Sequence, residues 1–478
     1  MTRGRVLVFA AGAVVLLGTG CAQTATGRAH PVLRHVSAGA AGSSGRATSV
    51  PGTGAAGSWG RATSVPGLAA LDKGREAEVK SVSCAAPGSC AAVGWYIDGG
   101  GHHQGFVVSE RNGRWRQAVG LVTVNPGGTS GVSSVSCGSP GFCAAVGFYK
   151  DGRGEHQGFV VNEESGVWGT AVGVPGLAAL NTGGNAEVSS VSCAAPGSCA
   201  VAGFYTDGGG HQQGFVAVER DGAWGRAAGA PGLGARNTGG SAVNSVSCAS
   251  PGNCAAGGYT FTRGAAQAFV VSETNGRWGT AQEVGANLNA GGSAGVGPVS
   301  CFSPGNCAAG GGYTGPGSQA FVINEVNGTW GNAQEVAGNV YLPEGGSVDV
   351  LSCPSAGNCS AGGTYADSGH DGVLLVGEKN GVWGPGISLG WAEYLTSLSC
   401  ASAGNCAAGG GYETSGAWVA MENNGVWGKE TTVPGLDALT KGPDVSVSSV
   451  SCPSAGSCVA GGDYQETGGH HSLQGFVT

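Results

Sequence analysis

The stretch from residue 82 to residue 115 contains the pattern that decides the fold: Val82-Ser83-Cys84, Cys90-Ala-Ala-Val-Gly-Trp-Tyr96, Gln104-Gly-Phe-Val-Val-Ser-Glu110 and Asn112-Gly-Arg-Trp115. Short apolar segments separated by Gly-containing turns are typical of β-strands. The Asn-Gly pair at 112–113 is the strongest short-range signal for a β-hairpin. We therefore expect four short antiparallel strands here, called the first to the fourth strand of a unit.

This unit recurs about every 50 residues along the chain of 478 residues, eight times in all. A period of this length with four strands per unit is the signature of a β-propeller. The sequence therefore predicts an all-β fold, an eight-bladed β-propeller with four antiparallel strands per blade. An open solenoid of eight units is the alternative.

The two ends of the repeat region indicate how the ring closes. The last unit stops at Gly475-Phe-Val-Thr478, inside its third strand, whereas Trp59 and the Val65-Pro-Gly-Leu68 segment match the fourth strand and the following turn of other units. We expect this amino-terminal strand to complete the last blade, with Trp59 beside the strand of Phe476, which removes an exposed sheet edge. Residues 44–52 nearly copy residues 59–67, but Ser44 replaces Trp59 and cannot fill its place, so we assign residues from 59 onward as the closing strand.

The composition excludes several classes of protein. Gly accounts for 97 residues but follows no G-X-Y period, so the chain is not collagen, and Gly at this density weakens helices. Hydrophobic residues make up 41% of the chain, which argues against disorder over most of its length. A net charge of −8 gives no reason to expect nucleic-acid binding.

The amino terminus has the features of an export signal. Arg3 and Arg5 precede an apolar run from residue 6 to residue 17, and small residues lead to Cys21. This pattern resembles a bacterial lipoprotein signal, with Leu17 one place earlier than usual. We expect a signal peptide at 1–21, lipidation of Cys21, a tether rich in Ala, Gly and Ser at 22–56, and the propeller at 57–478. The chain would then lie outside the cytoplasm as a monomer held to the membrane by its lipid only; plain secretion is the alternative.

Sixteen of the 17 Cys form eight pairs of identical spacing, Cys-x5-Cys. In an exported chain such pairs indicate disulfides, whereas zinc sites favour tighter spacing with four converging ligands. We expect no metal and no cofactor, and eight disulfides: Cys84–Cys90, Cys137–Cys143, Cys193–Cys199, Cys248–Cys254, Cys301–Cys307, Cys353–Cys359, Cys400–Cys406 and Cys452–Cys458.

The motif V-S-C-x5-C-x-A-x-G with a later G-x-W resembles the Cys-containing β-propeller repeats of secreted and lipid-anchored actinobacterial proteins. The resemblance covers residues from about 58 to 478. It implies the fold and the compartment, but propellers carry many different functions, so it implies no single activity.

Residues that recur from unit to unit are expected to build the blades. These are the Tyr that ends the second strand, counted in all eight units, the Glu that ends the third strand in seven units, the fourth-strand Trp, and the Gln of Q-[G/A]-F in units 1 to 5 and 8. We expect the Tyr to pack between blades with its hydroxyl hydrogen-bonded, and the Glu to bond the following turn. Seven equivalent carboxylates do not resemble a catalytic pair, which needs two acids in different environments.

Residues that differ between units are the candidates for function. They gather in the loops between second and third strands, which share one face, the upper face, with the connections between blades. The lower face carries the disulfides and the Asn-Gly turns. The interpretations are a solvated turn, a ligand-recognition patch or a metal site. The ligand-binding candidates are Asp98, His102, His103, Asp151, His156, Asp207, His211, His470 and His471.

Three functions remain open. The first is a binding or scaffold module for a protein or carbohydrate partner, without catalysis, because no nucleophile motif, H-E-x-x-H or P-loop is present. The second is a secreted enzyme that acts on glycans, of the glycosidase or lyase type. The third is a quinoprotein-type propeller, for which we find no cofactor-specific residues. The sequence favours the first.

Overall fold

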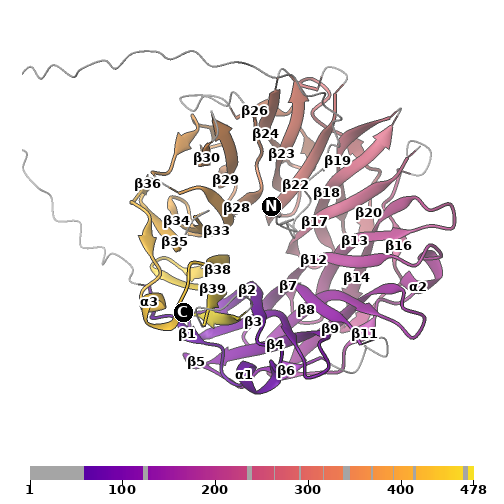
Figure 1. Cartoon of the computed structure of the whole chain (residues 1–478). Helices are drawn as coiled ribbons and strands as arrows, with labels where there is room; N and C mark the ends of the chain where they lie inside the picture. The colour runs from indigo at the N-terminus through magenta and orange to yellow at the C-terminus, as the bar shows by residue number, and fades with distance from the viewer. Residues whose placement is uncertain are drawn as a thin grey trace, which may run out of the picture.

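The computed structural model describes residues 59–121, 128–233, 239–262, 264–289, 292–315, 317–336, 345–367, 370–390, 392–412, 416–466 and 472–478. Eight sheets are arranged around a central axis, as the eight-bladed propeller requires (Figure 1). The expected signal peptide, Cys21 and tether lie outside these residues.

Three long strands form the body of each blade. The first strands of blades 1 to 8 are β2 (Ala77–Ala86), β7 (Ser130–Ser139), β12 (Ala186–Ala195), β17 (Ser241–Ser250), β22 (Ala294–Ser303), β28 (Val350–Ser355) with β27 (Gly345–Gly346), β33 (Tyr394–Ser402) and β38 (Val445–Ser454). The second strands are β3 (Ser89–Ile97), β8 (Phe142–Lys150), β13 (Ser198–Thr206), β18 (Asn253–Thr262), β23 (Asn306–Gly315), β29 (Asn358–Asp367), β34 (Asn405–Gly411) and β39 (Ser457–Gln465). The third strands are β4 (His103–Arg111), β9 (His156–Glu164), β14 (Gln212–Arg220), β19 (Ala265–Thr274), β24 (Gly317–Val326), β30 (His370–Lys379), β35 (Ala417–Asn423) and β40 (Leu473–Val477).

The fourth strand is short and is interrupted in blades 1 to 7. Its two pieces are β5 (Arg114–Trp115) and β6 (Val119–Gly120), β10 (Val167–Trp168) and β11 (Val172–Gly173), β15 (Ala223–Trp224) and β16 (Ala228–Gly229), β20 (Arg277–Trp278) and β21 (Gln282–Glu283), β25 (Thr329–Trp330) and β26 (Gln334–Glu335), β31 (Val382–Trp383) and β32 (Ile387–Ser388), and β36 (Val426–Trp427) and β37 (Thr431–Thr432). Three single-turn helices follow fourth strands: α1 (Leu68–Leu71), α2 (Leu177–Leu180) and α3 (Leu436–Leu439).

The first strand of each blade lies innermost and the fourth outermost, and adjacent strands are antiparallel. The hydrophobic core lies between blades rather than within one sheet. For example, Val93 and Val107 of blade 1 pack with Val135 and Phe159 of blade 2. Because each blade is covered on both sides, its second and third strands are apolar on both faces, which accounts for the low content of charged residues.

The ring closes as the sequence predicts. In blade 8, β1 (Thr63–Ser64) pairs with β40, with Thr63 opposite Val477 and Ser64 opposite Phe476. Trp59 packs against the hydrophobic cluster of this blade, and an added Cβ on Gly60 would lie 3.8 Å from the Cβ of Thr478. The amino-terminal strand therefore supplies the missing outer strand of the last blade, and the open solenoid is wrong.

The Ser of each V-S-C motif joins neighbouring blades. In blade 1, the Ser83 hydroxyl oxygen accepts a 3.0 Å hydrogen bond from the backbone N–H of Cys137 in blade 2. The same bond, 2.9–3.0 Å long, is present at every junction, including the one from Ser451 of blade 8 to Cys84 of blade 1. The eight bonds form a closed circle, which gives the motif a structural reason that spacing alone did not reveal.

The lower face is built as expected. All eight predicted disulfides are formed, each between the first and second strands of one blade. The neighbouring turns are also joined, for example by the 3.1 Å hydrogen bond from the N–H of Gly113 to the carbonyl of Gly88. Each disulfide closes a loop of seven residues, worth about 2 kcal/mol on the chain-entropy model.

The prediction for the third-strand Glu is wrong. Where their partners are seen, these carboxylates bond across the blade junction rather than to their own turn. Glu163 of blade 2 accepts a 2.6 Å hydrogen bond from the hydroxyl of Ser109 in blade 1, and the same hydroxyl oxygen accepts a 2.8 Å bond from the indole of Trp168. We call this three-residue contact the junction lock. Equivalent locks are formed by Asn162, Ser272 and Asn324 with the Glu and Trp of the next blade.

The count of eight equivalent Tyr is also corrected. In blade 4, Tyr259 pairs with Ala268, whereas Tyr96 of blade 1 pairs with the Gln of Q-G-F. The next residue, Thr260, occupies the Tyr position, because blade 4 has one residue fewer between its second Cys and this Tyr. Where hydroxyl partners are seen, they lie on the fourth strand of the same blade: Ser388 for Tyr365, Glu335 for Tyr313 and Ser64 for Tyr464.

Candidate functional site

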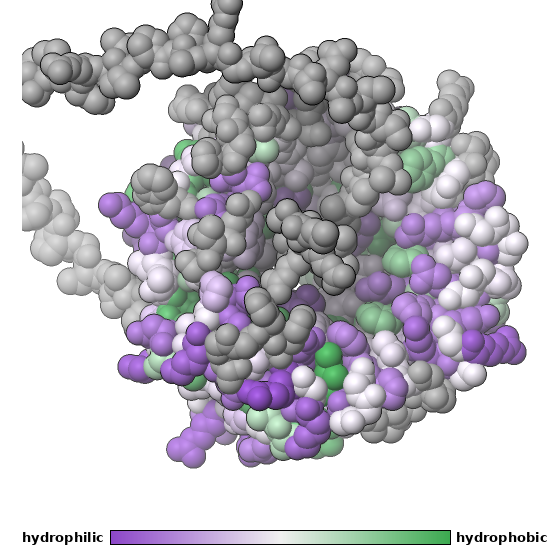
Figure 2. Space-filling view, in the orientation of Figure 1, coloured by the Kyte–Doolittle hydropathy of each residue, from purple (hydrophilic) through white to green (hydrophobic). Residues whose placement is uncertain are grey.

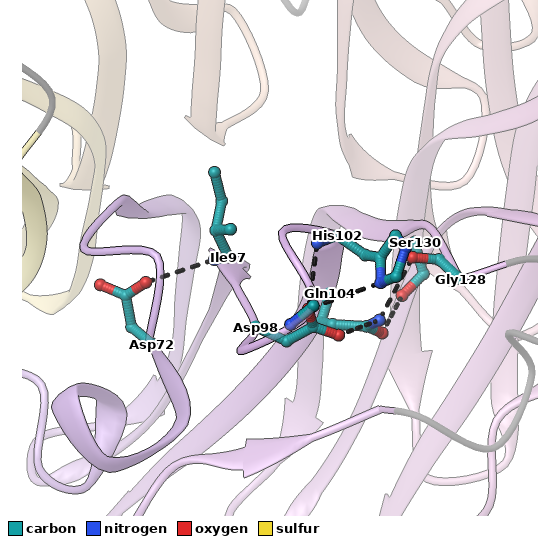
Figure 3. Close-up of polar contacts among 8 residues, drawn as sticks. Asp72, Ile97, Asp98, His102, Gln104, Gly128 and Ser130 are labelled. Atoms are coloured by element: carbon teal, nitrogen blue, oxygen red, sulfur yellow. Dashed lines mark hydrogen bonds and ion pairs between the residues drawn. The ribbon is translucent and has the colours of Figure 1, made fainter.

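The upper-face loop of blade 1 is organised by Asp98 (Figure 3). One carboxylate oxygen accepts hydrogen bonds from the N–H groups of Gly100 and His102, at 2.8 and 3.0 Å. The other accepts a 3.0 Å bond from the side-chain amide of Gln104, which also reaches Gly128 of the next blade. Asp98 is thus a turn residue that ties its loop to the repeated Gln, which is itself a scaffold residue as expected.

Asp151 and Asp207 repeat this arrangement in blades 2 and 3. Asp207 accepts from the N–H of His211 at 3.0 Å and from the amide of Gln213 at 2.9 Å, and these two bonds hold its pKa below the ordinary range. For Asp98 and Asp151, burial acts to raise the pKa, but the hydrogen bonds from the loop outweigh it and the pKa is lowered. All three carboxylates are ionised and are engaged within their own loops.

The predicted histidines fall into two geometric groups. His102 and His211 are exposed, and each places its Nδ1 near the Asp of its own loop, 3.5 Å from Asp98 and 3.7 Å from Asp207. They belong to separate blades and do not converge on a common point. This group matches the interpretation of a solvated turn.

His103 and His156 form the second group, at the first positions of β4 and β9. The ring of His103 lies on Trp95, with centroids 4.5 Å apart, and that of His156 stacks on Phe148, 5.2 Å apart at 16°. Burial, followed by the charge of Lys150, lowers the pKa of His156, so this ring is neutral at pH 7. A neutral imidazole offers one donor and one acceptor to a ligand.

The aromatic partners of these histidines were missed in the sequence. Trp95, Phe148, Phe204 and Tyr259 occupy the same position in the second strands of blades 1 to 4, where each pairs with Gly or Ala on the third strand. Blades 5 to 8 have Gly312, Thr364, Gly411 and Asp463 at this position. The signal for these rings in the sequence is the aromatic residue directly before the Tyr that ends the second strand, in blades 1 to 3.

These aromatic rings lie at the upper ends of four consecutive blade junctions, from blades 1 and 2 to blades 4 and 5. Strand alternation places Trp95 on the same side of blade 1 as Val93 and Val107, which pack against blade 2. The four aromatic residues, all half-buried, therefore form an arc over blades 1 to 4, with His103 and His156 beside the first two. We call these six residues the aromatic arc.

The blade 8 counterpart of Trp95 is an acid. Asp463 is buried and accepts a 2.5 Å hydrogen bond from the hydroxyl of Ser446. Burial, and then the nearby charge of Glu78, raises its pKa to about 7. Glu78 in turn pairs with Lys80 at 2.6 Å. Two carboxylates in different environments thus meet where blade 8 contacts blade 1: Asp463 is buried with a raised pKa, and Glu78 is paired with a lysine.

Two further inner carboxylates lie in other blades. Glu187 of blade 3 accepts a 3.1 Å hydrogen bond from Ser133, and Asp349 of blade 6 accepts one from Ser347; burial raises the pKa of both. In the described part of the chain, no group of three or more His, Cys, Asp or Glu is arranged to hold a metal ion. His470 and His471, the last two candidates, lie outside the described residues.

The space-filling view shows the face hollowed at the centre of the ring, with hydrophilic residues and small hydrophobic patches over the described surface (Figure 2). Two small cavities lie elsewhere, beside the disulfides of blades 2 to 4 on the lower face, with volumes of about 20 and 10 Å³. That is the space of a single water molecule. Neither cavity lies near the aromatic arc.

No protein-family model matches the chain, and no curated protein matches it. Solved propellers are similar in structure. Sqt1 from Chaetomium thermophilum is 12% identical over 85% of this chain and 97% of its own, with a TM-score of 0.49. YCF48 from Cyanidioschyzon merolae is 12% identical over 72% and 94%, with a TM-score of 0.41, and a fucose-specific lectin from Aleuria aurantia is 11% identical over 65% and 95%, with a TM-score of 0.33.

At these identities, the likeness concerns the fold alone. The eight disulfides are typical of an extracellular or otherwise oxidising compartment. A search of the described residues for a helix long and apolar enough to cross a membrane finds none.

Proposed function

We propose that this protein is an exported binding module, held to the outer side of the cell membrane through lipidated Cys21, that takes a carbohydrate or protein ligand on its upper face. The proposal includes membership of the actinobacterial type of Cys-containing propeller that the motif resembles. The export signal at 1–21 and the disulfides support the compartment.

The observation that carries the binding function is the aromatic arc. Most repeated residues have a structural role. Ser83 and its equivalents form the circle of hydrogen bonds between blades, and Glu163 and Trp168 form a junction lock. Gln104 holds the loop of Asp98. The arc, in contrast, is not repeated around the ring and is confined to blades 1 to 4. Half-buried aromatic rings next to imidazole groups that can hydrogen-bond suit ligands with both apolar and polar surface, such as sugars and peptide side chains.

A screen of residues 57–478 against glycan and secreted-protein arrays tests the proposal. A ligand should be found, and the triple variant His103→Ala, His156→Ala and His211→Ala should weaken its binding about tenfold or more without changing the melting temperature. Val167→Ala and Val426→Ala, on exposed valines of the lower-face hairpins, are the matched controls and should bind normally. A triple variant that unfolds, or that binds as well as the controls, would contradict the proposal.

The pair of Asp463 and Glu78 supports a second candidate, an enzyme that cleaves glycans. An acid with a raised pKa beside a second carboxylate in a different environment is the arrangement that general acid–base catalysis of glycoside cleavage uses. This alternative predicts release of reducing ends from a bound glycan, abolished by Asp463→Asn. The binding module predicts no release from either the wild type or the variant.

A further inference from the structure

The closing strand of the ring is encoded twice in the sequence. Residues 60–67, Gly-Arg-Ala-Thr-Ser-Val-Pro-Gly, are identical to residues 45–52, which lie 15 residues earlier in the chain. The first copy differs only in its flanks, with Ser44 in place of Trp59 and Thr53 in place of Leu68. The second copy, residues 60–67, is the one whose contacts the structure describes.

The contacts of the second copy lie within the identical octapeptide. On the blade 8 side, Ser64 shares a 2.6 Å hydrogen bond with the hydroxyl of Tyr464, and the N–H of Val65 donates to the carbonyl of Gly475 at 3.0 Å. On the blade 7 side, the N–H of Ala62 donates to the carbonyl of Pro434 at 2.8 Å. The Val65 side chain is buried in the cluster shared by blades 8 and 1.

We propose that the slot which receives residues 60–67 is a binding site for either copy, and that residues 45–52 of the same chain occupy it in a minor, slipped register. In that register residues 53–67 form a loop that returns to Leu68, so the helix α1 and the connection to blade 1 keep their places. This inference goes beyond the proposed function and does not depend on it.

The flanking residues make residues 60–67 the major occupant. Trp59 packs against the cluster of blade 8, and Leu68 is buried next to the octapeptide, whereas Ser44 offers no such surface. The slipped register also has to close a loop of 15 residues, which costs entropy. Trp59 therefore favours residues 60–67 over residues 45–52, although Trp59 itself lies outside the octapeptide that fills the slot.

The two registers give different distances between the ring and the amino terminus. With Cys21 as the proposed anchor, the major register leaves residues 22–59 between lipid and ring, and the slipped register leaves residues 22–44. The difference of 15 residues corresponds to roughly 50 Å of extended chain. Exchange between the copies would therefore draw the binding face toward the membrane or release it.

Engineered disulfides test the slipped register in the full chain. The Cβ positions of residues 60 and 478 are 3.8 Å apart, the usual separation in a disulfide. Gly60→Cys with Thr478→Cys is therefore the control and should cross-link almost completely. Gly45→Cys with Thr478→Cys should give a smaller fraction of cross-linked monomer, and Trp59→Ser should raise that fraction at least twofold.

Peptide mapping without reduction distinguishes these new bonds from the eight native ones. The absence of a monomeric link from residue 45 to residue 478, with and without Trp59→Ser, would overturn the proposal if the control links. A link found only in dimers would also overturn it, since the copies would then exchange between chains.

Thermal unfolding of matched charge variants gives an independent test. Val65→Asp puts a carboxylate at the buried position of residues 60–67. Val50→Asp puts one at the equivalent position of residues 45–52. Val50→Asp alone should change the melting temperature by less than about 1 °C, and Val65→Asp should lower it. The double variant should melt about 5 °C lower again, because neither copy then fits the slot. Equal melting temperatures of Val65→Asp and the double variant would overturn the proposal.

Discussion

The junction between blades 1 and 2 and the closing junction between blades 8 and 1 are built from the same repeat but are held differently. At the first, Ser109 joins Glu163 and Trp168 in a complete lock. At the second, β40 ends at Val477, which occupies the position of Val107, and no lock is formed among the described residues. Among the described residues, one carboxylate oxygen of Glu110 and the indole N–H of Trp115 are buried there without partners.

The closing junction is held by other contacts. Asp72, which is 5% exposed, accepts a 2.6 Å hydrogen bond from Gln474 of blade 8 and a bond from the N–H of Glu76. It also accepts a bond from the N–H of Ile97 (Figure 3). The pairing of β1 with β40 and the bond from Cys84 to Ser451 complete the contact. The repeat therefore specifies what is common to all junctions, and the closing junction has the acid Asp72 where the junction between blades 2 and 3 has the neutral Asn181.

The largest expected effect is at Asp72. Asp72→Ala removes a buried carboxylate and leaves the Gln474 amide and two N–H groups without their acceptor, so unfolding should become easier by about 3 kcal/mol. Asn181→Ala, at the equivalent place between blades 2 and 3, removes a neutral side chain that makes similar bonds and should cost about 1–2 kcal/mol. Urea unfolding measures both. A smaller loss for Asp72→Ala than for Asn181→Ala would contradict the special role of the closing junction.

The second effect is a pH dependence confined to the closing junction. The pKa of Asp463 is raised to about 7, well above that of the unfolded chain, because of burial and the charge of Glu78. Its contribution to stability is therefore fully present below about pH 4 and is lost as the pH rises through about 7, by up to about 4 kcal/mol. Asp463→Asn should remove this part of the decline when melting curves are compared from pH 4 to 8. An unchanged decline in the variant would show that another group causes it.

The third effect compares the third-strand Glu at a junction with a complete lock and at the closing junction, where the described residues form none. Glu163→Gln weakens a complete lock and should lower the free energy of unfolding by about 1 kcal/mol. Burial raises the pKa of Glu110, which has no lock, so Glu110→Gln should be neutral or stabilising by about 0.5 kcal/mol. Guanidinium unfolding of the two variants gives the comparison, and equal losses would mean that the lock contributes nothing.

Much of the fold could be predicted from the sequence because the same pattern of strands, turns and Cys recurs eight times. Strand number, disulfide pairing and closure by the segment after Trp59 follow from spacing and turn residues. The partners of Glu163 and Ser83 were not accessible, because both bonds cross between blades and depend on their relative height. Tyr259 was misplaced for a local reason, since one residue fewer moves it to the other side of its strand.

The candidate site was predicted less completely. The loop residues Asp98, Asp151 and Asp207 could be found from their Asp-Gly pattern, and the structure engages them in their own turns. The aromatic arc depends on which side of a strand each ring occupies, and on packing against the next blade. No loop motif marks that combination, and for the same reason Asp463 is not among the candidates predicted from the sequence.

The most direct test of the closed ring is amide hydrogen exchange at Cys84. Its N–H bonds to the hydroxyl oxygen of Ser451 only if blades 8 and 1 are in contact, whereas Cys137 and Cys193 make the same bond at ordinary junctions. We predict that the Cys84 amide is protected in the native protein within about tenfold of the other two. Exchange of Cys84 at the rate of an unprotected amide, with Cys137 and Cys193 protected, would show that the ring is open and would contradict the account.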